Sequence, residues 1–289
     1  MMILSELEDF SYCIHRNGEF NRIGSLYSNT HNRIVPITNI DELELLKTKK
    51  EITGVIITPE LIDHVPLNFG IIVTKTPLIV SLEIHNSLEQ NEYDSQFPTI
   101  IHKTAKIHPT ADIDPHGVII EYKSKIDAYV RIHKGVIIGK NVRIGSNTTI
   151  GSIPNPDNEN PDTLSYLVHG KVIIEDKARI HANVTIERPY YSEETRIGQE
   201  CHIDSQTKIC QGTIISKSTL IAAIVTIGSY VMIGEGCWVG PRCSIKPGVK
   251  IGKSCHITLG SRVEKTISPE MIVKDNWAIK RERFKGFIP

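Results

Sequence analysis

The sequence predicts a mainly β protein: a parallel β-helix, preceded by a small α/β domain and followed by a short C-terminal helix. Two observations predict this fold class. An apolar residue recurs at every sixth position over long stretches of the chain. Apolar residues make up 40% of the sequence but aromatic residues only 6%, so Ile and Val supply most of the core volume, as is typical of β proteins.

The six-residue repeat is most regular between Ile197 and Val263, where every sixth residue is Ile or Val. Earlier tracts run from Ile120 to Ile150 and from Ile174 to Ile186. A period of six fits neither an amphipathic helix nor a simple alternating strand, and Gly or Asn recurs in the expected turns. Each hexad therefore predicts a short strand and a turn, and three hexads make one coil that stacks on the next.

A second small or β-branched residue stands two positions before each of these anchors, which predicts two inward-facing residues per hexad. Four cysteines occupy this position: Cys201, Cys237, Cys243 and Cys255. Cysteine packs well as a small apolar residue, and no CxxC pair occurs, so we expect core packing rather than metal binding or disulfides.

The sequence divides into three predicted parts. Residues 1–98 read as an α/β domain, with buried strands at 54–58 and 70–74, helices at 41–49 and 77–88, and a polar linker at 90–98. Residues 99–268 form the predicted β-helix. Residues 269–289 lose the period and read as a helical tail that covers the end of the stack.

Two interruptions break the predicted β-helix. The stretch 152–170 is rich in Pro, Asn and Asp but preserves the phase of the repeat, so we expect an external loop that carries function. The stretch 187–194 (ERPYYSEE) shifts the phase.

Charge and hydropathy exclude several functions. Lys plus Arg number 33 and Asp plus Glu also number 33, so we expect no nucleic-acid binding from a global positive field. We expect no membrane span, since no apolar run reaches about 18 residues. The N-terminus lacks the positive charge and apolar core of a signal peptide, which favours a cytoplasmic protein.

The hexapeptide repeat resembles the left-handed β-helix acyltransferase superfamily. More specifically, the chain looks like the family of lipid A synthesis that N-acylates UDP-3-O-acylglucosamine, in its small N-terminal domain and in the stretches IHPTADIDPHGVI, KVIIEDKARIHANVTIER and IGKSCHITLGSRVEKTISPEMIVKDNWA. The resemblance implies a left-handed helix and a homotrimer with active sites between subunits. It also implies transfer from acyl-CoA or acyl carrier protein to the amine of a nucleotide-linked amino sugar, in lipopolysaccharide or surface polysaccharide synthesis.

The expected catalytic residues follow from the same resemblance. Asp204 matches the family's aspartate, but Gln211 stands where the family has its general-base histidine, and glutamine cannot take a proton near neutral pH. We therefore expect Gln211 to position the amine and Asp204 to accept its hydrogen bond. The base would be His181 or His202, or the amine would lose its proton without a protein base.

Further residues are expected to bind substrates. Gly212 would donate its backbone amide to the oxyanion, and His169 is a third histidine candidate near the acceptor. In the N-terminal domain Asn39 matches a residue of the family's uracil site, although Pro36 and Glu42 replace both aromatic residues of that pattern. This departure leaves the nucleotide open. The sequence shows no hydrophobic groove for a long acyl chain, and the chain looks closer to sugar-modifying relatives that use short acyl-CoA donors. Three cations are candidates for the phosphates of the donor: Arg242, Lys246 and Lys280.

Three other functions compete with this prediction. A γ-type carbonic anhydrase would need three histidines that converge on zinc, whereas the histidines here are spread over separate turns, so we expect no metal. An O-acyltransferase would need a base more strongly than an N-acyltransferase does, so the missing histidine favours an amine acceptor. The same absence would also suit a non-catalytic scaffold.

Overall fold

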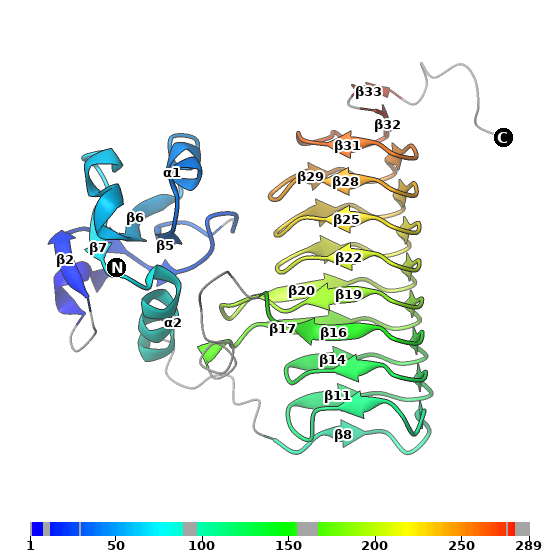
Figure 1. The fold of residues 1–289 in the computed structure, drawn as a ribbon. Coiled ribbons are helices and arrows are strands. Elements are labelled where there is room, and N and C mark those ends of the chain that lie inside the picture. Colours follow the sequence, from blue (N-terminus) through cyan, green and yellow to red (C-terminus); the bar gives the residue numbers. More distant parts are fainter. Residues whose placement is uncertain are drawn as a thin grey trace. The chain divides into compact units, whose positions relative to one another are not determined.

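The structure is a computed structural model that describes residues 2–7, 12–28, 30–88, 97–154, 167–275 and 277–280. The chain divides into two compact units. The first comprises Met1–Tyr93 and Asp157–Val168, and the second comprises Asp94–Pro156 and His169–Pro289 (Figure 1). No described helix has the length and apolar character needed to cross a membrane.

The first unit is built on a five-stranded sheet in the order β2-β7-β6-β5-β4. Strands β4 to β7 are parallel and β2 is antiparallel to β7. Its strands and helices are β1 (Met2–Ile3), η1 (Leu4–Glu6), β2 (Cys13–Arg16), β3 (Glu19–Phe20), β4 (Arg22–Ile23), β5 (Arg33–Ile37), α1 (Ile40–Leu46), β6 (Ile52–Ile57), η2 (Pro59–His64), β7 (Gly70–Val73) and α2 (Pro77–Leu88). Both predicted strands and both predicted helices are therefore present. The apolar faces of these elements form a separate core that includes Val35, Val55 and Ile71.

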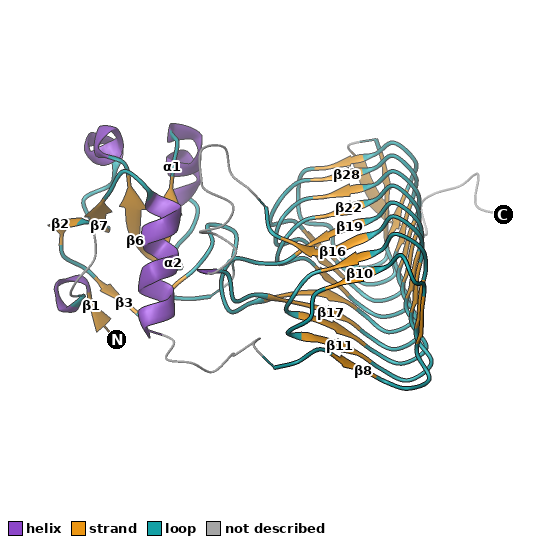
Figure 2. Ribbon diagram, turned by 60° about the horizontal axis from the view of Figure 1, so that its bottom comes forward, coloured by secondary structure: helices purple, strands orange, loops and turns teal. Residues whose placement is uncertain are grey.

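The second unit is a left-handed parallel β-helix, which confirms the predicted fold class. Its three flat sheets, named here after their first strands, form the sides of a triangular prism (Figure 2). The β8 sheet contains β8 (Ile100–Ile101), β11 (Val118–Ile120), β14 (Val136–Ile138), β17 (Lys171–Ile174), β20 (Glu194–Ile197), β23 (Ile214–Ile215), β26 (Met232–Ile233) and β29 (Lys250–Ile251).

The other two sheets complete each coil. The β9 sheet contains β9 (Lys106–Ile107), β12 (Lys125–Ile126), β15 (Arg143–Ile144), β18 (Arg179–Ile180), β21 (His202–Ile203), β24 (Leu220–Ile221), β27 (Trp238–Val239), β30 (His256–Ile257), β32 (Met271–Lys274) and β33 (Trp277–Lys280). The β10 sheet contains β10 (Asp112–Ile113), β13 (Arg131–Ile132), β16 (Thr149–Ser152), β19 (Thr185–Glu187), β22 (Lys208–Ile209), β25 (Thr226–Ile227), β28 (Ser244–Ile245) and β31 (Arg262–Val263).

The core of the β-helix is the column of hexad anchors that the sequence predicted. Every anchor from Ile197 to Val263 is buried, and so are the four cysteines two positions before an anchor. Most turns place one residue in the left-handed region, for example Asn183 with φ 58° and Gln206 with φ 60°. Asn tolerates this region better than most residues, which explains its recurrence there. Other recurring turn glycines, such as Gly145 and Gly228, lie where a Cβ would meet the backbone of the next coil at 2.7 Å and 2.6 Å.

The two interruptions lie at the corner between the β10 and β8 sheets, called here the β10–β8 corner. The first leaves after Ser152 and returns at Lys171, and residues 155–166 of this predicted loop lie outside the described residues. The second follows β19 and begins with Arg188, which is buried and donates from Nη1 to the backbone oxygen of Lys134 at 2.8 Å. In the coil from which the first interruption departs, no regular turn closes the β10–β8 corner. The guanidinium of Arg188 fills this corner.

The C-terminal end of the stack differs from the prediction. Met271–Lys274 and Trp277–Lys280 pair as the antiparallel strands β32 and β33 and do not form a helix, and β32 pairs in parallel with β30. The top coil offers unpaired backbone groups, which a strand satisfies and a helix would not. Ile272 and Val273 are buried at this end, whereas residues 281–289 of the predicted helix lie outside the described residues.

Candidate functional site

A histidine and an aspartate stack on adjacent coils at the corner between the β9 and β10 sheets, called here the β9–β10 corner. Strands β18 and β21 pair so that Ile180 lies opposite Ile203, which places the next residues, His181 and Asp204, one above the other. His181 Nδ1 lies 3.7 Å from Asp204 Oδ1. Both side chains are about half exposed (54% and 48%), so substrate can reach them.

The backbone fixes this pair. The amide of His181 donates to the oxygen of Ile203 at 2.9 Å, and the amide of Asp204 donates to that of Ile221 at 2.8 Å. Gly145 lies on the coil before His181, where a Cβ would approach the carbonyl carbon of His181 to 2.7 Å. A side chain at this glycine would displace the histidine backbone, so the close approach of the two coils requires glycine there.

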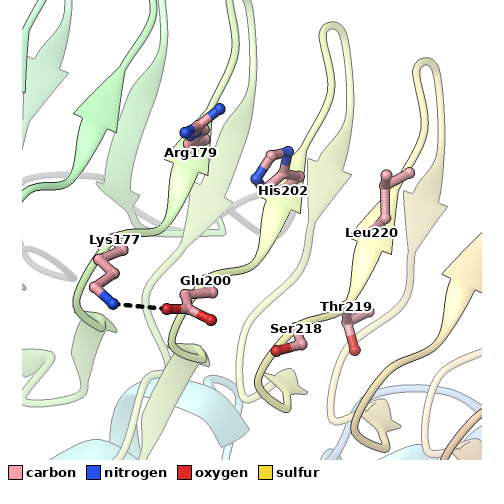
Figure 3. A pocket seen from close by; sticks show the side chains of 7 residues that line it. All are labelled: Lys177, Arg179, Glu200, His202, Ser218, Thr219 and Leu220. Atoms are coloured by element: carbon pink, nitrogen blue, oxygen red, sulfur yellow. Dashed lines mark hydrogen bonds and ion pairs between the residues drawn. The ribbon is translucent and has the colours of Figure 1, made fainter.

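An open groove lies on the outer face of the β9 sheet (Figure 3). Its lining residues are Lys177, Arg179, Glu200, His202, Ser218, Thr219 and Leu220. Its residue His202 is close enough to His181 to feel the charge of that imidazole. Figure 3 shows Arg179, His202 and Leu220 in a row on successive strands, with the Lys177–Glu200 ion pair of 2.8 Å beside them.

His202 in this groove can accept a proton. Burial lowers the pKa of His202, and the nearby Arg179 and His181 lower it further. The imidazole is therefore neutral at pH 7, with one nitrogen free of a proton.

Two predicted residues, Gln211 and His169, meet instead at the β10–β8 corner. Tyr190 connects them, since its amide donates to Gln211 Oε1 at 3.2 Å and its oxygen accepts from the amide of His169 at 3.2 Å. Strand β22 separates Gln211 from Asp204, which lie seven residues apart and on different corners. Because the two residues lie at opposite ends of one side of the prism, one chain does not bring Gln211 and Asp204 onto the same amine as expected.

The backbone amide of Gly212 does not face a substrate. It donates to Thr195 Oγ1 at 2.9 Å, and this hydrogen bond is buried. Gly212 has φ 69°, and a Cβ there would lie 2.5 Å from the ring of Tyr230. Gly212 therefore allows the corner to pack tightly. Its backbone amide is already used in the hydrogen bond to Thr195, so it is not available to bind an oxyanion as expected.

The same corner holds a buried carboxylate that the sequence analysis missed. Glu187 pairs with Lys208 at 2.9 Å, and burial followed by the charge of Glu187 raises the pKa of Cys210 to about 12. The phase shift at 187–194 was the available signal, because such breaks require side chains that replace a regular turn. These contacts stabilise the corner and leave the Cys210 thiol protonated.

The three predicted phosphate-binding cations do not gather in one place. Arg242 lies on the β9–β10 corner, two coils beyond Asp204 along the backbone ladder of that corner. Lys246 follows β28 and lies on the β10–β8 corner, two coils beyond Gln211. Lys280 is exposed at the end of the C-terminal hairpin.

Asn39 lies in the first unit, where it caps helix α1. Its Oδ1 accepts from the amide of Glu42 at 2.9 Å, and Glu42 Oε2 accepts from the amide of Thr38. These two hydrogen bonds make Asn39 the N-cap of helix α1, so a local structural role accounts for this residue.

Metal coordination has no assembled ligand set in the described part of the chain. There, no three His, Cys, Asp or Glu side chains lie close enough to hold an ion.

Comparison with known proteins defines the class. The sequence matches the bacterial transferase hexapeptide family (six repeats) over residues 117–152, 218–253 and 230–265. No curated protein sequence matches the chain. Fold and repeat together confirm the predicted resemblance to the left-handed β-helix acyltransferase superfamily.

Solved structures refine this class. A UDP-N-acetylglucosamine acyltransferase from Campylobacter jejuni is 25% identical, with a TM-score of 0.51 over 62% of this chain and 79% of that chain. The UDP-N-acetylglucosamine acyltransferase of Francisella novicida is 21% identical, with a TM-score of 0.52 over 62% of this chain and 67% of that chain. This chain is thus similar in fold to UDP-N-acetylglucosamine acyltransferases.

Proposed function

We propose that this chain is a cytoplasmic, homotrimeric N-acyltransferase. It transfers an acyl group from acyl-CoA or acyl carrier protein to the amine of a nucleotide-linked amino sugar, in the synthesis of lipopolysaccharide or another surface polysaccharide. The His181–Asp204 pair is the observation that carries the proposal. The hexapeptide fold and its similarity to acyltransferases that act on UDP-N-acetylglucosamine support the substrate class.

In this mechanism His181 is the general base. It takes a proton from the acceptor as the acceptor attacks the thioester carbonyl, and Asp204 stabilises the imidazolium that forms. The distance of 3.7 Å between Nδ1 and Oδ1 exceeds a hydrogen bond, but such contacts often tighten only in the substrate complex. The proton then passes to the departing thiolate.

The groove supplies the binding contacts. Among the described residues Arg179 has no carboxylate partner, so its guanidinium is free to bind a phosphate of either substrate. Neutral His202 stands beside it and accepts or donates one hydrogen bond.

O-acyl transfer is the second candidate, and the same His181–Asp204 pair could serve it as well. The sequence favours an amine acceptor because Gln211 stands where the family has its general-base histidine, and a hydroxyl acceptor needs such a base more strongly than an amine does. A histidine partner for Asp204 weakens that reasoning, since a base is then present and hydroxyl acylation becomes equally feasible. The N-terminal α/β unit supports the amine, because the N-acyltransferases that the chain resembles carry such a domain.

The deciding assay measures thiol release from acetyl-CoA and from longer acyl donors, with paired UDP- and dTDP-sugars that carry either an amine or a hydroxyl at the same carbon. We expect release with an amino sugar. The His181→Ala variant should lose about 100-fold or more of kcat, the range that a general base contributes.

His108→Ala is the matched control, since His108 also follows an anchor at the β9–β10 corner and is exposed. Its kcat should stay within about twofold. Release only with hydroxyl sugars would establish the second candidate. No release with any pair from a folded protein would favour a scaffold.

A further inference from the structure

Two parallel columns of exposed cations lie on the first four coils of the β-helix. One follows the corner between the β8 and β9 sheets, and the other lies on the outer face of the β9 sheet. The columns are Lys103, Lys123, Lys140 and Lys177 at the corner, and Lys106, Lys125, Arg143 and Arg179 on the sheet. Only Lys177 and Arg179, at one end, line the candidate groove.

Strand register holds the cations of the sheet column directly beside one another. Lys106 pairs with Lys125, and Lys125 with Arg143. Arg143 in turn pairs with Arg179. Neighbouring strands lie about 4.8 Å apart, and like charges directly opposite on a sheet are destabilising. The free protein therefore bears a cost that an anionic partner would remove.

Few carboxylates neutralise these columns. Lys125 pairs with Asp127 at 2.8 Å, and Lys177 pairs with Glu200 at 2.8 Å. In the described part of the chain six members have no carboxylate within 4.0 Å: Lys103, Lys106, Lys123, Lys140, Arg143 and Arg179. Since the formal net charge of the chain is +0, this positive surface is local and not a property of the composition.

The spacing of the cations selects a partner. Each coil presents one cation per column every ~4.8 Å. An α-helix with one acidic residue per turn presents a carboxylate every ~5.4 Å, close enough for flexible lysine and arginine side chains to follow over four coils. Each strand of double-helical DNA presents a phosphate every ~3.4 Å along the helix axis, which fits the cation spacing less well.

The separation of the columns fits the same partner. Lys103 and Lys106 are three residues apart, at most about 10 Å, and a helix with its side chains is about 10–12 Å wide. A helix parallel to the coil axis would thus contact both columns with its two flanks. We propose that the double cation column is the docking surface for an acidic α-helix of a partner protein. The evidence for this surface is charge and register and does not rest on the proposed acyl transfer, although Lys177 and Arg179 at its end also line the candidate groove.

The test uses two synthetic, Ala-rich helical peptides of equal composition. In one peptide the glutamates lie on one broad face at i, i+3, i+4, i+7, i+8 and i+11, so that both flanks of that face carry carboxylates, and in the other they are dispersed around the helix. Fluorescence anisotropy measures their Kd for the full chain at low salt. We expect the one-face peptide to bind at least tenfold more tightly, and its binding to weaken steeply as salt is added.

The variants locate the contact. Lys123→Glu, Lys140→Glu and Arg143→Glu, combined, should weaken peptide binding at least tenfold and leave the melting temperature nearly unchanged. The matched control combines Lys250→Glu, Lys253→Glu and Lys265→Glu, three exposed lysines of later coils with the same total charge change, and should change Kd less than threefold.

Three results would overturn the proposal: no difference between the peptides, equal losses in test and control variants, or tighter binding of single-stranded DNA or phosphatidylglycerol vesicles than of the one-face peptide. Thiol release by the wild-type enzyme in the absence of peptide is measured in parallel. Failure of that assay bears on the acyl transfer and not on the docking surface.

Discussion

Two histidines illustrate how environment, rather than residue type, sets chemistry in this fold. Burial lowers the pKa of His133, and Arg131 and Arg188 lower it further, against an opposing effect of Asp114. His202 shows the same direction for similar reasons. His202 lies in strand β21 and not in a turn as the sequence predicted, so two different positions of the coil produce the same direction of shift.

The lowered pKa of His133 predicts a pH dependence of stability. The folded state binds fewer protons than the unfolded state between the lowered pKa and 6.5, so the free energy of unfolding is fully retained above about pH 6.5 and falls as the pH drops below it. Urea unfolding at pH 7.5, 6.5 and 5.5 measures this slope. His133→Asn should flatten it, whereas His108→Asn, an exposed turn histidine, should leave it unchanged.

Arg188 is a second residue whose role only the structure reveals. Its Nε is buried without a partner in the described residues, and its pKa is lowered to about 10 by burial, so it stays charged near neutral pH. Its Nη1 bond to Lys134 supplies a donor where the interrupted coil provides none. Arginine therefore completes a corner that a regular hexad would have closed with its backbone.

Arg188→Ala should destabilise the protein by about 2–4 kcal/mol, because it leaves a cavity and an unsatisfied buried carbonyl. Chemical denaturation monitored by far-UV circular dichroism measures the effect. Arg179→Ala, an exposed position, should change stability by about 0.5 kcal/mol or less. Equal effects would contradict the structural role of Arg188.

At the scale of elements, the hexad repeat predicts the coils because each strand has only two inward residues to specify. The tail was predicted wrongly because its apolar residues lack that period, and periodicity alone does not reveal that β30 offers an open edge. Strand pairing with a distant coil is a tertiary effect that overrides local preference.

The β32–β33 hairpin predicts that buried residues of β32 stabilise this end of the stack. Val273→Ala should cost about 1–3 kcal/mol, since Val273 is buried against the last coil and accepts the amide of Thr258 through its backbone. The neighbouring Lys274→Ala, which is exposed, should have little effect. Chemical denaturation of both variants provides the comparison, and equal losses would contradict burial of this strand.

The candidate site was predictable in part for the same reason. The repeat places Asp204 and Gln211 after successive anchors, hence on different corners, and this follows from counting hexads. The partnership of His181 with Asp204 spans 23 residues instead of the regular 18, because the phase shift at 187–194 intervenes. The path of this insertion cannot be read from the sequence. Sequence reasoning could therefore name His181 and Asp204 as candidates but could not show that they lie on top of each other.

At the scale of the whole molecule, the two units have separate apolar cores, one in the α/β sheet and one inside the β-helix. Separate cores allow a division of labour in which the β-helix performs the chemistry and the N-terminal unit binds part of the acceptor. The α/β unit was predicted to bind a nucleotide. Because Asn39 caps helix α1, that residue alone is not a sufficient test of nucleotide binding. The whole unit has to be removed to test it.

Removal of residues 1–96 tests this division. We expect the remaining β-helix to fold, with Val168→Ser added because Val168 is buried in the first unit and would otherwise be exposed. The KM for the nucleotide sugar should rise at least tenfold while kcat falls less than about threefold, since binding energy that is equal in ground and transition states affects KM alone. Thiol release at varied acceptor concentration separates the two parameters. An unchanged KM would assign nucleotide recognition to the β-helix, and loss of kcat alone would mean that the first unit supports the catalytic geometry rather than the acceptor.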